Sequence, residues 1–250
     1  MGVYQPRVRH LGQLVEDVSG QPFHHYLREH VFAPLGMEHT DLVRSERVRP
    51  QLATGHVLRA GGLKAVADRE VVTPGGCGLY ATTADMARYV AALLGGGAGE
   101  HGPVLKGDTL AWMFQPHFQL DPRAPGWGLG FELGDECGHR LVRHSGIVSG
   151  FLSDMVLAPD DGLGVVVFSN TGGLDGRGAS ELLARLCFAA CWGFPMGRSA
   201  PTSRPAPKSG ASSAAGTAQT RARSPTCLCG RPSALATRSP SAAATSCSSR

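Results

Sequence analysis

Residues 140–170 constrain the fold more than any other stretch of the sequence. Two apolar runs, Leu152–Ala158 and Leu163–Phe168, flank Pro159-Asp160-Asp161-Gly162, a turn whose Pro and Gly supply the backbone angles of a hairpin. Arg140–Arg143 precedes them as a third short strand, which ends in His144-Ser145-Gly146. The pattern predicts three antiparallel strands that present polar side chains and backbone N–H groups at one edge.

Helical periodicity surrounds this sheet on both sides. Leu11–Val18 has apolar residues at helical spacing and ends at Ser19-Gly20, and a second amphipathic helix follows Pro22. Thr82, with Asp85 three residues later, predicts a capped helix start. Asp41–Val72 is polar and weakly patterned, which favours a long surface excursion. Three further elements are expected: a short helix over Leu105–Phe114, a strand over Trp127–Leu133 and an apolar helix over Ala179–Phe194.

The end of the chain has a different composition from the rest. From Arg198 to Arg250 there are seven Arg, one Lys and no acidic residue, so this tail carries +8 of a whole-chain charge of +4. Residues 1–197 therefore carry −4, which argues against a nucleic-acid site there. Ser, Ala, Pro, Thr, Arg and Gly dominate the tail, and we expect disorder. It is either a linker or interaction tail, or the product of out-of-frame translation.

Cysteine and histidine usage predicts no cofactor and no metal. The seven Cys form no Cys-x-x-Cys pair, and an odd number without a framework argues against a disulfide scaffold. The cluster His24, His25, His30 and His39 has no Cys or carboxylate that completes a ligand set at helical spacing. No run approaches the ~20 apolar residues of a membrane span. The first ten residues lack the apolar core of a signal peptide, and the compartment stays open.

Five blocks in this order resemble the β-lactamase-related serine hydrolases, which include class C β-lactamases, D-Ala-D-Ala carboxypeptidases and esterases. The blocks are Leu11–Thr40, Pro74–Leu94, Gly126–Phe131, His144–Phe151 and Gly164–Gly173. The resemblance implies an α+β sandwich of the β-lactamase/transpeptidase type, with an antiparallel sheet flanked by helices. It also implies a small-molecule, peptide or ester substrate, and it leaves the oligomeric state unknown.

The catalytic residues of that family are only partly matched. The family uses a Ser-x-x-Lys nucleophile, a Tyr-x-Asn or Ser-x-Asn element and a Lys/His-Thr/Ser-Gly strand. His144, Ser145 and Gly146 match the strand, and Ile147 matches the residue whose N–H helps to bind the oxyanion. The lysines at 64, 106 and 208 follow Gly61, Pro103 and Pro205 by three residues, and Asn170, at a strand end, is the single asparagine. Neither of the other two elements therefore occurs.

His144 and Ser145 do not form a substitute catalytic pair in this reading. Adjacent residues of a strand point to opposite faces, so their side chains are badly placed to exchange a proton. Asp85 is better explained as a helix-start acid than as a catalytic base. The glycine-rich bend Pro74–Gly78 is either a wall of the family's cleft or a plain loop.

The sequence thus predicts a partial family domain over residues 1–197 and a disordered tail over 198–250. By the resemblance, the first strands and the nucleophile helix are missing, so the last strand of the sheet lacks a neighbour and the folded part should be poorly stable. We expect a truncated serine hydrolase that is inactive as written. The alternative is a non-catalytic binding or regulatory module that uses the basic tail for a partner.

Overall fold

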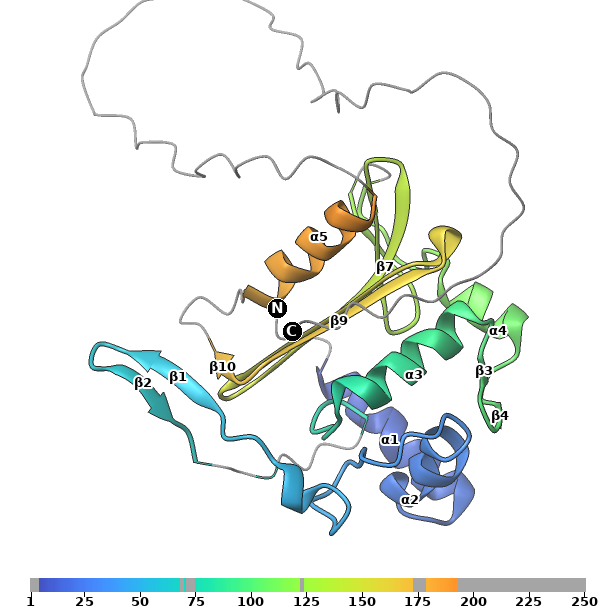
Figure 1. The fold of residues 1–250 in the computed structure, drawn as a ribbon. Helices are drawn as coiled ribbons and strands as arrows, with labels where there is room; N and C mark the ends of the chain where they lie inside the picture. The colour runs from blue at the N-terminus through green and yellow to red at the C-terminus, as the bar shows by residue number, and fades with distance from the viewer. Residues whose placement is uncertain (1–4, 68–69, 71–74, 122–123, 173–178, 193–250) are drawn as a thin grey trace, which may run out of the picture. The chain divides into compact units, whose positions relative to one another are not determined.

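The computed structural model describes residues 5–67, 70, 75–121, 124–172 and 179–192 (Figure 1). Contacts between Cα atoms divide the chain into two units, residues 1–202 and 203–250, and every described residue belongs to the first. The tail predicted over 198–250 therefore lies outside the described residues.

A five-stranded antiparallel sheet forms the centre of this unit, in the order β5-β6-β7-β8-β9. Its strands are β5 (Gly126–Trp127), β6 (Glu132–Glu136), β7 (His139–Val148), β8 (Phe151–Ala158) and β9 (Leu163–Ser169). The turn between β8 and β9 is confirmed. Pro159–Asp161 form one 3-10 turn (η3), and Gly162 follows in the left-handed conformation at φ 66°.

Two strand predictions were wrong in their bounds. β7 does not end at the triplet His144-Ser145-Gly146 but continues to Val148, because it pairs with β8 as far as Val148 opposite Phe151. That pairing overrides the weak strand propensity of Ser and Gly. The strand predicted over Trp127–Leu133 is divided between β5 and β6, and Gly130 interrupts it at φ 82°.

Helices cover both faces of the sheet. Helix α3 (Thr83–Leu94) lies on one face and α5 (Ala179–Cys191) on the other (Figure 1). On the α3 face, Val90 and Leu93 pack with apolar residues of β7 and β8, namely Val142, Met155 and Leu157. On the α5 face, Ala184 and Phe188 pack with Leu141, Val156 and Ala158. This alternation along each strand is typical of a sheet with two buried faces.

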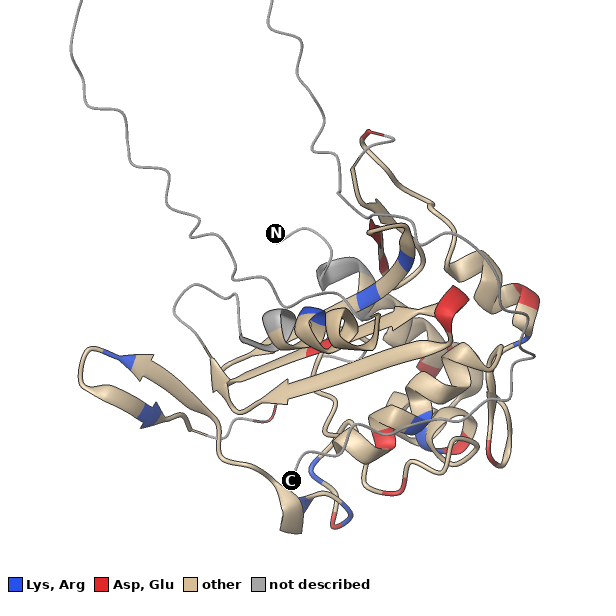
Figure 2. Cartoon of the chain, turned by 45° about the horizontal axis from the view of Figure 1, so that its top comes forward, with Lys and Arg blue, Asp and Glu red and all other residues tan. Residues whose placement is uncertain are grey.

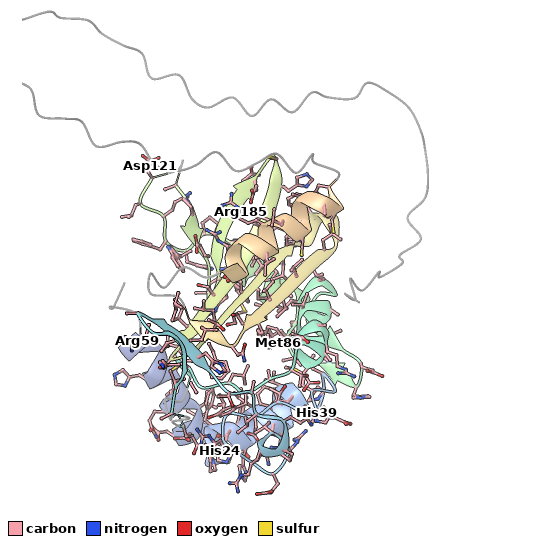
Figure 3. The ribbon with its side chains drawn as sticks, turned by 60° about the vertical axis from the view of Figure 1, so that its left-hand side comes forward. His24, His39, Arg59, Met86, Asp121 and Arg185 are labelled. Atoms are coloured by element: carbon pink, nitrogen blue, oxygen red, sulfur yellow. The ribbon has the colours of Figure 1, made fainter. Side chains whose placement is uncertain are left out.

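Helix α1 (Gln5–Ser19) is followed by α2 (Phe23–Leu27), which continues into the π-helical turn η1 (Arg28–Phe32). Phe32 of η1 and the residues Leu35 and Met37 that follow it pack against Ala92 of α3 in a third apolar cluster. Met86 on α3 contacts both this cluster and the core on the sheet, between which it lies (Figure 3). The helix predicted over Leu105–Phe114 is confirmed as α4 (Gly107–Met113).

The remaining elements are short. The segment Asp41–Val72, expected to be irregular, contains the 3-10 turn η2 (Arg49–Gln51) and a hairpin of β1 (His56–Arg59) and β2 (Gly62–Ala65). Strand β10 (Thr171–Gly172) pairs with β1 in parallel, a long-range contact that local patterning does not reveal. Strands β3 (Ala98–Gly99) and β4 (Gly102–Pro103) form a two-stranded sheet. Among the described residues, no helix has the length and apolar character needed to cross a membrane.

Candidate functional site

The second half of β7 has one paired edge and one open edge. Strand β6 pairs with β7 only as far as Glu132 opposite Arg143. Strand β8 pairs with β7 along the whole stretch from Val142 to Val148. Among the described strands, none therefore pairs with the other edge of β7 beyond Arg143 (Figure 1). All four residues predicted for the site lie on this open stretch: His144, Ser145, Gly146 and Ile147.

His144 and Ser145 occupy opposite faces of the sheet, as expected from strand geometry. His144 lies opposite Met155, and it shares the α3 face with Met155 and Val142. Ser145 lies opposite Asp154 and shares the α5 face with Leu141. The arrangement gives no route for direct proton transfer between the two side chains.

The imidazole of His144 favours its neutral form. Protein atoms around the ring reduce its hydration, and this desolvation lowers the pKa of His144 from its ordinary value. The residue is nevertheless exposed by surface area, so its ring keeps contact with water and the lowering should be modest. Near neutral pH, one ring nitrogen of the uncharged His144 can therefore donate a hydrogen bond and the other can accept one.

Gly146 and Ile147 give this edge its shape. A Cβ atom at Gly146 would collide with Oγ of Ser153, which lies opposite it on β8, so a side chain here would displace Ser153. Ile147 follows with 62% of its surface exposed. A large apolar residue that stays in solvent on a strand edge is compatible with a surface that meets a ligand or another part of a protein.

The glycine bend, of which residues 75–78 are described, packs against α1. Gly75 has φ 74°, and a Cβ atom there would lie 2.7 Å from the carbonyl oxygen of Val8 and 3.1 Å from the backbone nitrogen of Gly12. Only glycine allows both the left-handed conformation and this close approach. The bend is thus a packing element, and its possible role as a cleft wall stays a prediction.

Two carboxylates, those of Asp41 and Asp85, are fully buried, and the sequence pattern predicted the burial of neither. Asp41 accepts a hydrogen bond from Nη2 of Arg28 at 2.5 Å, and its backbone exchanges hydrogen bonds with Tyr80. Asp85 was assigned only to the helix start, but it also binds a loop 45 residues earlier in the chain. Both join distant segments, and neither lies on β7. In the part of the chain that is described, no group of three or more His, Cys, Asp or Glu could hold a metal ion.

Comparisons with known proteins identify the fold and the family. The octameric penicillin-binding protein homologue from Pyrococcus abyssi superposes with a TM-score of 0.61 at 22% identity, over 74% of this chain and 41% of that one. The D-amino acid amidase from Ochrobactrum anthropi SV3, solved with D-phenylalanine, gives 0.56 at 21% identity, over 73% of this chain and 56% of that one. The fold is therefore the α+β fold of the penicillin-binding proteins and β-lactamases.

Matches to the amino-acid sequence identify the family within this fold. The family model described as Beta-lactamase matches residues 8–190, and the chain belongs to this family of serine hydrolases. Penicillin-binding protein 4 from Amycolatopsis lactamdurans is 30% identical over 171 residues. The match covers 65% of this chain but only 45% of that protein, so the chain spans less than half the length of this relative.

Proposed function

We propose that the described unit supplies the β7 side of an acyl-transfer cleft of this family. The observation that carries the proposal is the open stretch His144–Val148, whose outer edge no described strand pairs with, beside the imidazole of His144, whose pKa is lowered by desolvation. An extended acyl substrate can add its own backbone to such an edge, as a further strand does. Family resemblance assigns the N–H of Ile147 to the oxyanion that forms when the acyl group is attacked.

The names of two similar proteins support a substrate class. One is a penicillin-binding protein, and another is a D-amino acid amidase solved with D-phenylalanine. We therefore propose β-lactams, D-amino acid peptides or amides, and esters as the substrates of the complete catalytic machinery.

We further propose that the 250-residue chain, on its own, performs no acyl transfer. A Ser hydroxyl needs an adjacent base before it can attack a carbonyl. The sequence has no Ser-x-x-Lys, and the strand places His144 and Ser145 on opposite faces. Ser145 has Asp154 as its cross-strand neighbour, but a carboxylate is a weak base for a hydroxyl.

Turnover measurements test this proposal. The purified chain is incubated with a chromogenic cephalosporin, a nitrophenyl ester and D-phenylalanine amide, and product is measured against a buffer blank. We expect rates equal to the blank for the chain and for Ser145→Ala. A rate above the blank that disappears in Ser145→Ala would overturn the proposal, because it would make Ser145 a working nucleophile.

A further inference from the structure

Helix α1 exposes its apolar face to solvent. Val8, Leu11, Leu14 and Val18 recur at spacings of three and four residues, which places them on one side of the helix. Leu11 is 59% exposed, Leu14 55% and Val18 80%. The adjacent side, where Gly12 follows Val8 by one turn, is the covered one: Gly12 is buried against the bend at Gly75, and Val15 and Glu16 are half-buried. The helix therefore rests on the protein along that side and leaves Leu11, Leu14 and Val18 uncovered.

The charges of α1 are divided along its length. The first half carries Arg7, Arg9 and His10, and the second half carries Glu16 and Asp17. The helix macrodipole favours the reverse order, with acidic residues near the amino end and basic residues near the carboxyl end. The order found here does not stabilise the isolated helix. When a second copy of α1 runs in the opposite direction, however, the basic half of each helix lies beside the acidic half of the other.

We propose that two copies of this chain associate through α1, with the two helices antiparallel and their apolar faces in contact. A two-fold axis near Gln13 places Leu11 of one copy beside the Leu14 region of the other. It also places His10 of each copy beside Asp17 of its partner, because both residues are exposed and lie seven positions apart on one flank of the apolar face. Two antiparallel macrodipoles attract each other as well.

The expected affinity is low. One pair of four-turn helices buries less than the roughly 800 Å² per partner of a standard stable interface. We therefore expect a dissociation constant on the order of 10–100 μM, within the range of a transient complex. The dimer should be populated at the concentrations used for sedimentation or NMR and lost on dilution.

Sedimentation velocity of the full chain between low and high micromolar concentration tests the proposal. The wild type should show a concentration-dependent shift from monomer to dimer. Leu11→Lys should weaken the association at least tenfold, because it places two charges at the centre of the apolar contact. Leu120→Lys is the matched control, since Leu120 is 87% exposed, lies outside α1 and should leave the association unchanged.

Charge exchange tests the antiparallel arrangement itself. His10→Glu should weaken the dimer several-fold, because it places two carboxylates side by side across the two-fold axis. Asp17→Lys should also weaken it, because it removes the carboxylate that accepts a hydrogen bond from His10 of the partner copy. The double variant His10→Glu/Asp17→Lys places opposite charges across the axis and should restore the association.

Four results would overturn the proposal. They are a monomer at every concentration, equal effects of Leu11→Lys and Leu120→Lys, no recovery in the double variant, and a monomer that binds phosphatidylcholine vesicles through Leu11. The last result would assign the apolar face to a membrane surface.

Discussion

Asp85 is a fully buried carboxylate that joins two segments of the chain. Its Oδ2 accepts hydrogen bonds from the backbone N–H of His39 and from Oγ1 of Thr40, both at 2.8 Å. Its Oδ1 accepts a third from Nη1 of Arg88 at 3.0 Å. The sequence predicted the helix cap at Thr82, whose side chain accepts from the N–H of Asp85. It could not predict the bond to Thr40, because local patterns carry no information about a partner 45 residues away.

Removing the Asp85 carboxylate should destabilise the fold. Asp85→Ala leaves Oγ1 of the buried Thr40 without a partner and removes the bonds from His39 and Arg88, which should lower the free energy of unfolding by about 3 kcal/mol. Asp108→Ala is the control, since Asp108 is exposed in the first turn of α4 and should cost about 0.5 kcal/mol. Urea unfolding followed by circular dichroism measures both. Equal effects of the two substitutions would contradict the role given to Asp85.

His144 should titrate below the ordinary histidine pKa of about 6.5. Desolvation lowers its pKa in the folded chain, so the unfolded chain binds the proton first as the pH falls. The stability that depends on neutral His144 is therefore present above pH ~6.5 and is lost as the pH falls through the folded pKa. NMR titration of the His144 ring, assigned with His144→Gln, measures the value directly. A pKa at or above that of an unfolded histidine would refute this reading.

At the scale of single elements, the sequence predicted the turns and helix caps that depend on residues adjacent in the chain. The turn at Pro159–Gly162 and the cap at Thr82 depend on residues next to each other in the sequence, and both are confirmed. The parallel pair of β1 with β10 depends on residues more than a hundred positions apart. The end of β7, in contrast, is set close by in the sequence, because β7 pairs with β8 across the tight turn at Gly150 as far as Val148 opposite Phe151.

The contact between α3 and β9 depends on Gly164. A Cβ atom there would collide with Cγ1 of Val90, so α3 approaches the strand more closely than any side chain allows. Gly164→Ala should destabilise the fold by about 1–3 kcal/mol, and Val90→Ala in the same chain should recover part of that loss. Gly134→Ala is the control, because nothing lies within 4 Å of its Cβ position, and it should stay within about 0.5 kcal/mol. Thermal or urea unfolding of the four proteins checks the order.

At the scale of the whole molecule, the sequence predicted the sheet and its covering helices but not the exposed apolar face of α1. Apolar residues at strand and helix spacing predicted antiparallel strands and separate helices, and the family resemblance implied that the helices flank the sheet; the fold confirms that architecture. Strand β9 lies at one edge of the sheet among the described residues, and it carries no charged side chain (Figure 2). The exposed face of α1 was not foreseen, because helical spacing does not show which side of a helix is covered.

Covalent labelling tests the central claim most directly, because it detects an acyl-enzyme even where turnover is slow. The purified 250-residue chain is incubated with a fluorescent penicillin and with a fluorophosphonate, and bound label per chain is counted by fluorescence and intact mass. Penicillin-binding protein 4 from Amycolatopsis lactamdurans serves as the positive control for the penicillin. The account predicts no label on this chain above that on a heat-denatured sample. One label per chain that is absent from the heat-denatured sample or from Ser145→Ala would contradict it.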